Sequence, residues 1–223
     1  MENTALIFRQ IRINLPVKKF SAMMLDIHPE ALNIGLHGLG PVSDEAFEQF
    51  CASNPELRIE RAPNGNLIIM PPVHAESGNY EGEAFGQLYN WNRQSRLGKV
   101  FSASAGFTLP DDSIRSADAS WVANEKYDAL SAGERKSFAH LVPDFVVEIK
   151  SDTDSLRKLK EKMSNTWIAN GVQLAWLLDV EAEKAYIYHA NGTVEVVEGF
   201  DKKLSGESVL PDFEFDLNLL KSN

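Results

Sequence analysis

The chain has 223 residues, of which 43% are hydrophobic and 24% are charged, and its formal net charge is −10 at pH 7. These proportions are ordinary for a globular protein and exclude a disordered, fibrous or repetitive chain. The apolar runs are much shorter than the roughly 18 residues of a membrane-spanning helix, and the N-terminus has no apolar core of a secretory signal, so we expect neither.

Residues 1–40 are expected to form an N-terminal extension. Two short apolar clusters there are followed by a glycine-rich run. A turn explains these glycines better than a phosphate-binding loop, because no strand clearly precedes them and no Lys-Ser or Lys-Thr pair follows. No internal repeat or low-complexity linker divides the remaining residues, 41–223, so we expect them to form one domain.

Caps and turns mark the first elements of this domain. Ser43 is a favourable N-cap for a short helix through Ala52. The turn Pro63-Asn64-Gly65 separates two alternating runs, 57–62 and 66–70. This arrangement predicts a β-hairpin.

Helical spacing then predicts a long helix over residues 76–96, with Gly98 as its stop. A short polar helix over 132–140 and an amphipathic helix over 155–170 are also expected. Strand-like runs occur at 99–102, 106–109, 114–122, 142–150, 173–178, 185–189 and 193–197. The predicted fold class is therefore α/β, with a central mixed β-sheet flanked by helices.

The run 142–150 is the most β-like segment and carries a Glu-x-Lys pair. Because successive strand residues alternate between faces, Glu148 and Lys150 point to the same face. Two charges on a β-branched strand are costly unless they sit at an open rim, pair with partners or hold a metal. A cross-strand salt bridge is the simpler interpretation, and the spacing alone leaves both open.

Asp118 is a lone carboxylate in the preceding predicted strand, 114–122. If the two strands are neighbours, Asp118 and Glu148 could converge on one hard cation, which prefers oxygen ligands and often retains water. Taken alone, such an aspartate is more often a structural hydrogen-bonding residue. Glu76, at the start of the long helix, has a similarly simple interpretation as a carboxylate stabilised by the helix dipole.

Other charged or reactive residues are less specific. The five histidines have no zinc-type spacing and there is no Gly-x-Ser-x-Gly elbow, which argues against zinc and acyl-transfer chemistry. The single cysteine, Cys51, excludes an internal disulfide and favours the cytoplasm. The acidic net charge weighs against extensive contact with nucleic acid, but a local basic cluster could still meet a phosphate backbone. That cluster consists of Arg157, Lys158, Lys160 and Lys162.

Several motifs together suggest a family. They are Met70-Pro71-Pro72, Glu76, Gly106-Phe107-Thr108-Leu109-Pro110, Ile114-Arg115-Ser116-Ala117-Asp118, Pro143-Asp144-Phe145-Val146-Val147-Glu148-Ile149-Lys150, Lys162-Met163, and Asn170-Gly171-Val172 leading to Trp176-Leu177-Leu178-Asp179. From about Pro55 to Leu220 the chain thereby resembles the Uma-type family of restriction endonucleases, within the PD-(D/E)xK superfamily. One departure is Ala117, where the family usually has proline; this should alter backbone stiffness more than chemistry.

The resemblance implies a restriction-endonuclease-like core and metal-assisted hydrolysis of phosphodiester bonds in nucleic acid, DNA in the first instance. The implied catalytic and supporting residues are Asp118, Glu148, Lys150, Glu76 and Lys162. Asp118 and Glu148, with the Ile149 carbonyl, would hold Mg²⁺ or Mn²⁺, and Glu76 would complete the metal's shell. Lys150 would orient the attacking water or offset charge on the phosphate. A homodimer is a further expectation, since nucleases that cut both strands often pair two sites.

Two alternatives stay open. A non-catalytic nucleic-acid-binding or assembly module would keep the fold and reduce Glu148 and Lys150 to a salt bridge, in keeping with the acidic net charge. Another enzyme with paired carboxylates, such as a glycosidase, would need one acid with a raised pKa. The adjacent lysine disfavours that reading, because a nearby cation lowers carboxylate pKa values. Metal affinity distinguishes the nuclease from the module.

Overall fold

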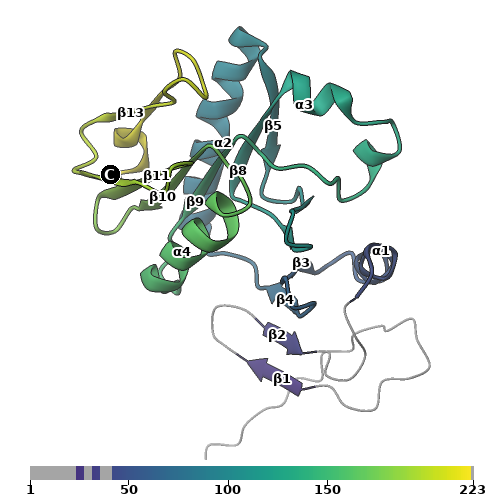
Figure 1. The fold of residues 1–223 in the computed structure, drawn as a ribbon. Coiled ribbons are helices and arrows are strands. Elements are labelled where there is room, and N and C mark those ends of the chain that lie inside the picture. The colour runs from purple at the N-terminus through teal and green to yellow at the C-terminus, as the bar shows by residue number, and fades with distance from the viewer. Residues whose placement is uncertain (1–23, 28–31, 36–41, 222–223) are drawn as a thin grey trace, which may run out of the picture.

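A computed structural model describes residues 24–27, 32–35 and 42–221 of the chain (Figure 1). The central sheet of the described residues has six strands in the order β12 (Val194–Glu198), β11 (Lys184–His189), β10 (Leu174–Asp179), β9 (Phe145–Ile149), β8 (Ala119–Ala123) and β5 (Gly98–Ser102). Strands β9 and β10 run parallel, and the other described pairs of this sheet run antiparallel. The prediction of a mixed α/β fold is therefore confirmed.

The second sheet is also six-stranded among the described residues. Its order is β1 (Met24–Ile27), β2 (Leu32–Gly35), β4 (Leu67–Met70), β3 (Arg58–Arg61), β7 (Ile114–Arg115) and β6 (Phe107–Thr108). Strands β3 and β4 form the predicted hairpin. Strand β2 pairs with β4. Most of the expected extension, residues 1–40, lies outside the described residues, so its separation from the domain stays a prediction.

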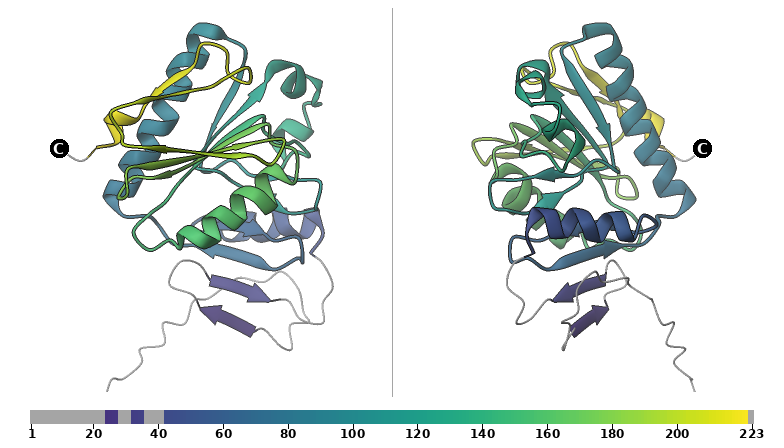
Figure 2. Two further views of the ribbon diagram at one scale, coloured as in Figure 1. Left: turned by 60° about the vertical axis from the view of Figure 1, so that its left-hand side comes forward. Right: turned by 90° about the vertical axis from the view of Figure 1, so that its right-hand side faces the viewer.

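The helices are α1 (Asp44–Ser53), α2 (Ala75–Ser95), α3 (Asn124–Ala129) and α4 (Leu156–Lys162), with a π-helix, η2 (Met163–Ile168), continuing α4. Two 3₁₀ turns, η1 (Glu134–Lys136) and η3 (Leu217–Leu220), and a small sheet of β13 (Lys203–Ser205) and β14 (Glu214–Asp216) complete the described elements. Figure 2 shows α2 and α4 on opposite sides of the central sheet. Among the described helices, none is both long and apolar enough to cross a membrane.

Strand alternation assigns the two faces of the central sheet, as predicted for residues 142–150. Phe145, Val147 and Ile149 pack in the cluster on the α2 face. Val146 packs in the cluster on the opposite face, which α4 and η2 cover. Glu148 therefore points toward α4 and η2, on the same side as Val146.

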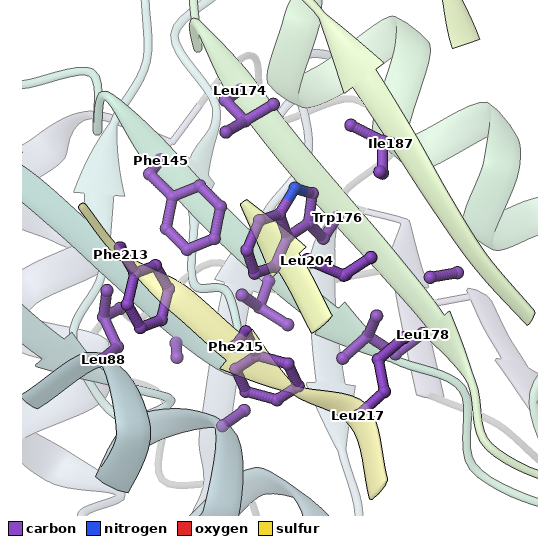
Figure 3. Packing of buried hydrophobic residues seen from close by; sticks show 14 of the residues in the cluster. Leu88, Phe145, Leu174, Trp176, Leu178, Ile187, Leu204, Phe213, Phe215 and Leu217 are labelled. Atoms are coloured by element: carbon purple, nitrogen blue, oxygen red, sulfur yellow. The ribbon is translucent and has the colours of Figure 1, made fainter. Parts of the chain in front are cut away.

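Aromatic side chains fill both faces. On the α2 face, Trp176 of β10 stacks on Phe213, with ring centroids 5.9 Å apart (Figure 3). Phe213 lies just before β14, so the small C-terminal sheet, which sequence patterns did not predict, closes this half of the core. On the other face, Met163 and Trp167 of η2 are fully buried. The predicted amphipathic helix over residues 155–170 corresponds to α4 followed by η2. Gly171 comes after it with φ +103°.

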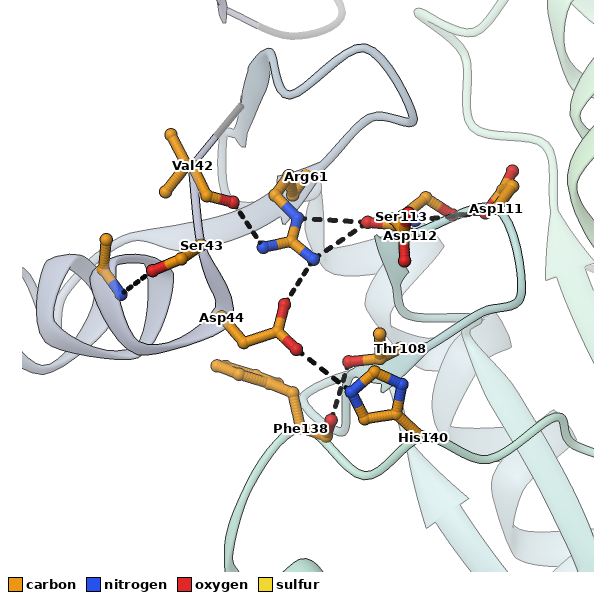
Figure 4. Close-up of polar contacts among 11 residues, drawn as sticks. Val42, Ser43, Asp44, Arg61, Thr108, Asp111, Asp112, Ser113, Phe138 and His140 are labelled. Carbon is orange, nitrogen blue, oxygen red and sulfur yellow. Dashed lines mark hydrogen bonds and ion pairs between the residues drawn. The ribbon is translucent and has the colours of Figure 1, made fainter. Parts of the chain in front are cut away.

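Arg61 joins α1 to the second sheet (Figure 4). Its guanidinium donates hydrogen bonds to the carbonyl oxygens of Val42 and Asp112 and to the Asp44 carboxylate, the last at 2.6 Å. The Ser43 side chain caps α1, as predicted. A buried guanidinium whose N–H groups donate to all these acceptors fixes the position of α1.

The prediction of one strand over residues 114–122 is wrong. The segment divides into β7 in the second sheet and β8 in the central sheet. Ile114 packs with α1 and the second sheet, whereas Ala119 packs in the central core. Between them the Ser116 N–H donates to the buried Glu60 carboxylate at 3.0 Å. Asp118 therefore lies just before β8, at the crossing between the two sheets.

The predicted helix over residues 132–140 is also wrong. Only η1 is helical there, and a helix forms earlier, as α3. The Thr108 N–H donates to the Ala139 carbonyl at 2.9 Å, and the Leu141 N–H donates to the Thr108 carbonyl at 3.3 Å. Pairing with β6 thus fixes residues 139–141 in an extended form that local polarity does not reveal.

Gly98 does not end the long helix, contrary to prediction. Helix α2 ends at Ser95, and Arg96 adopts the left-handed conformation at its C-cap, with φ 57°. Gly98 instead opens β5, where a Cβ atom would overlap the Val122 carbonyl oxygen and the Trp121 indole. Close packing between β5 and β8, rather than helix capping, requires glycine here.

Replacing Gly98 with alanine is expected to lower the free energy of unfolding by about 2–3 kcal/mol, because a backbone oxygen cannot easily yield to the added methyl group. Gly82→Ala in α2 is the matched control, since nothing lies within 4 Å of a Cβ built there. Helix propensity predicts a gain of up to about 1 kcal/mol for that control. Urea unfolding measures both; equal stabilities would show that β5 and β8 adjust to the methyl group.

Candidate active site

A cavity of about 340 Å³ lies where the ends of β8 and β9 meet α2, α4 and the second sheet. Six charged side chains line it from separate parts of the chain: Arg58 from β3, Glu81 from α2, Asp118 from the residue before β8, Glu148 from β9, Asp154 from the turn before α4 and Lys162 from α4. Residues 70–74, from the end of β4 and the segment after it, form another part of its wall. The cavity is therefore rich in charge and built from both sheets.

Asp118 reaches this cavity through the pairing of β8 with β9. Ala119 pairs with Val147, which brings the preceding residue, Asp118, beside Glu148. The Ile149 N–H donates to Asp118 Oδ2 at 2.8 Å, so one carboxylate oxygen is fixed on the neighbouring strand. The two strands are neighbours, as the convergence of Asp118 and Glu148 requires.

Glu148 is held by side chains of α4 and η2. Its Oε1 accepts hydrogen bonds from Lys162 Nζ and from the buried Trp167 Nε1, each at 2.7 Å. The Glu148 side chain is 6% exposed and that of Lys162 is 22% exposed. An almost buried carboxylate thus has a partner that reaches the cavity.

The two carboxyl groups carry raised pKa values. Burial, together with the charge of nearby Glu81, raises the pKa of Asp118 to about 6. Burial raises the pKa of Glu148 to about 7; the Asp118 charge adds to this and Lys162 opposes it. Burial alone would lower the pKa of Lys162, but Glu148 and Glu60 outweigh it and the pKa is raised. Burial thus favours the protonated form of both carboxyl groups. The cavity lining also has four carboxylates, Glu81, Asp118, Glu148 and Asp154, but only two cations, Arg58 and Lys162.

Sequence reasoning missed three charged residues of this cavity, Arg58, Asp154 and Glu81. Burial raises the pKa of Glu81, and the charge of Glu148 contributes to that rise. A signal was present, because Glu81 shares a helical stripe with the buried residues Ser77, Ala84 and Leu88 of α2. A carboxylate on the buried side of a helix needs a polar or metal partner.

Glu76 and Lys150 lie elsewhere. Both line an adjoining cavity of about 510 Å³. Glu76 Oε1 accepts a hydrogen bond from the Tyr80 hydroxyl at 2.8 Å. Lys150 Nζ lies 3.7 Å from Asp179 on β10 and 3.5 Å from Glu181. The structure brings Asp118, Glu148 and Lys162 together, but not Lys150 or Glu76 with them.

The predicted basic cluster on α4 is divided among different surroundings. Arg157 donates to Glu161 at 2.6 Å, one turn away. Lys160 Nζ lies 3.9 Å from the centre of the Tyr186 ring. Of the basic residues in this cluster, Lys162 is the one that lines the cavity with Asp118 and Glu148.

The donor set fits a divalent cation that keeps water or substrate ligands. Within residues 42–221, no three His, Cys, Asp or Glu side chains are grouped so that they could hold a metal ion. Mg²⁺, however, is commonly bound through one or two carboxylates plus substrate phosphates. Asp118 and Glu148 supply two such carboxylates, and Ile149 lines the same cavity. Their surplus negative charge is what a cation would neutralise.

Comparison with known proteins finds a matching family model and solved structures of related fold. The family model Uma2, described as "Putative restriction endonuclease", matches residues 44–219. A crystal structure of a "putative nuclease" from Anabaena variabilis ATCC 29413 superposes with a TM-score of 0.63 at 18% sequence identity, covering 74% of this chain and 90% of that one. A search of curated proteins gave no match. At this identity, the superposition supports the fold alone.

Proposed function

The chain belongs to the Uma2 family, and from that membership we propose that it is a divalent-metal-dependent endonuclease that hydrolyses phosphodiester bonds of nucleic acid, DNA in the first instance. One observation carries the proposal. Asp118 and Glu148, from adjacent strands, converge in a cavity with raised pKa values of about 6 and about 7. Adjacent buried carboxyl groups with raised pKa values are typical of a functional site.

Within this proposal, Asp118 and Glu148 would hold Mg²⁺ or Mn²⁺, with the Ile149 carbonyl and Glu81 as further candidate ligands. The cation would supply Lewis-acid chemistry, by polarising the phosphate and acidifying a water molecule. Lys162, which lies at the cavity beside Glu148, would offset negative charge on the phosphate.

The two residues of the adjoining cavity keep more distant roles in the proposal. Lys150 and Glu76 line the space next to the charged site. There they would contact the part of the nucleic acid next to the cleaved bond, or support the strand that carries Glu148. Glu81 takes the place in the cavity that family resemblance assigned to Glu76.

A non-catalytic binding module is the second candidate, and the ion pairs favour it. Lys162 lies 2.7 Å from Glu148 and Arg58 lies 3.7 Å from Asp118. In such a module, the role of the two carboxylates would be to form these ion pairs and so stabilise the fold. The net charge of −10 also agrees with a module that contacts little nucleic acid.

Metal binding as a function of pH separates the two candidates. Metal ligands must be deprotonated, so the pKa values of about 6 for Asp118 and about 7 for Glu148 predict that Mn²⁺ affinity rises with pH up to about 7. Between pH 5.5 and 7.5 we expect a gain of about one to two orders of magnitude, measured by calorimetry. Cleavage of plasmid and single-stranded DNA by the same protein should show the same dependence. No binding at either pH would favour the module.

The stability of the metal-free protein should change in the opposite direction. The folded-state pKa values of Asp118 and Glu148, about 6 and about 7, lie above their ordinary values of 3.8 and 4.5. In this interval the folded protein keeps protons that the unfolded chain has lost, so stability falls as the pH rises. Mn²⁺ should reverse the loss, because it binds the folded state.

A further inference from the structure

Arg58 is the most loosely held cation of the charged cavity. Its side chain extends from β3 and is 31% exposed. Its Nη2 lies 3.7 Å from Asp118 Oδ1, which is an ion pair beyond hydrogen-bonding distance. Within the described part of the chain, its buried Nε–H has no hydrogen-bond partner. The guanidinium thus enters the cavity with unused donor capacity.

Neighbouring cations are fixed more firmly. On the same strand, Arg61 donates to two backbone carbonyls and a carboxylate. Arg115 of β7 donates to the buried Glu60 at 2.8 Å. Lys162 is bound to Glu148 at 2.7 Å. Arg58 is therefore the cation of this region that can change partner at the lowest cost.

An anion in this cavity needs such a cation. Glu81, Asp118 and Glu148 would repel a phosphate, and Lys162 is already paired with one of them. A guanidinium presents donors in a planar fork that matches two phosphate oxygens. The Asp118 oxygen nearest Arg58 is Oδ1, whereas Oδ2 is already held by the Ile149 N–H. A divalent cation and Arg58 would therefore compete for Asp118 Oδ1.

We propose that Arg58 binds the backbone phosphate of the substrate in this cavity, and that it exchanges Asp118 for that phosphate when a divalent cation occupies the carboxylates. The inference rests on the proposed function. In the metal-free protein, Arg58 neutralises Asp118. In the metal-bound protein, the cation would replace Arg58 as the partner of Asp118, and the guanidinium would then be free to bind the phosphate. One residue thereby links metal binding to substrate binding.

The test uses three variants of the full chain: Arg58→Gln, Arg58→Lys, and Arg93→Gln as a matched loss of charge. Arg93 is exposed, near the far end of α2, and rests on the Tyr89 ring. Fluorescence anisotropy measures binding of a short DNA duplex and of its single strand, in EDTA and in Ca²⁺. Calorimetry measures Mn²⁺ affinity, and thermal unfolding checks that each variant folds.

Arg58→Gln is expected to weaken DNA binding in Ca²⁺ about tenfold or more, with a smaller loss in EDTA, where Asp118 still competes for Arg58. Its Mn²⁺ affinity should stay unchanged or rise several-fold, because a competing cation has gone. Arg58→Lys should recover only part of the DNA affinity, since an ammonium lacks the fork. Arg93→Gln should match the wild type.

Two results would overturn the inference. DNA binding by Arg58→Gln equal to that of Arg93→Gln would show that Arg58 does not bind phosphate. A loss of Mn²⁺ affinity in Arg58→Gln would show that it only positions Asp118. If the wild type binds DNA through Arg58 but cleaves neither plasmid nor single-stranded DNA, the proposed nuclease activity fails and the inference about phosphate binding stands. If the wild type binds no DNA in any buffer, both fail.

Discussion

Glu148→Gln is expected to abolish metal-dependent cleavage, lowering kcat/KM by about 10³-fold or more, and to weaken Mn²⁺ binding by at least about tenfold. The amide is neutral and a poor ligand for a hard cation. It keeps an acceptor oxygen for Lys162 and Trp167, which both donate to Glu148 Oε1. The variant should therefore fold, so that loss of activity reports on the site. Calorimetry and plasmid cleavage measure the two effects.

Glu195→Gln on β12 provides the control for Glu148→Gln, because it removes the same charge from an exposed position of the same sheet. It should bind Mn²⁺ and cleave DNA like the wild type. Undiminished cleavage by Glu148→Gln would contradict the proposed metal site. Loss of cleavage in both variants would point to a general charge effect on the protein.

Lys162→Met is expected to have the largest effect on stability, about 3 kcal/mol at pH 8, because it leaves carboxylates at the cavity without their cation. Lys162 pairs with Glu148 and its charge also lowers the pKa of the buried Glu60. The loss should shrink at pH 5, where Glu148, with its pKa of about 7, is protonated. Lys162 itself stays charged across this range, because its pKa is raised above 10.5. Urea unfolding at both pH values measures the difference.

The matched control for Lys162→Met is Lys158→Met, one turn earlier on α4 and exposed. Its effect should stay within about 0.5 kcal/mol at both pH values. A cost for Lys162→Met that is the same at pH 5 and pH 8 would contradict the electrostatic explanation and point to lost packing of the lysine stem.

Several local features could be read from the sequence because neighbouring residues determine them. The Ser43 cap, the turn at residues 63–65 and the alternation through Val146 and Glu148 depend on local hydrogen bonding and on the strand period. The predicted helix over 155–170 follows from apolar spacing in the same way. In these segments the local hydrogen bonding and the spacing of buried residues predict the same secondary structure.

Other features depended on segments distant in the chain. Asp118 lies at a crossing between sheets because Ser116 bonds to Glu60, more than fifty residues earlier. Gly98 is required by the Trp121 indole, and residues 139–141 are held by Thr108. No periodicity within a short window contains these partners. The resulting predictions of a single strand, a helix stop and a polar helix were therefore wrong.

The sequence by itself determined the α/β class and the family, because motif and period are properties of the chain. That β8 and β9 are neighbours, with Asp118 just before β8 and beside Glu148, comes from the structure. The tertiary structure alone decided which charges share a cavity. It placed Glu81 and Arg58 beside Asp118 and joined Lys162 to Glu148, while Lys150 and Glu76 went to the adjoining cavity. The physical reason is that buried charge must be offset across space, and the partners come from whichever elements pack there.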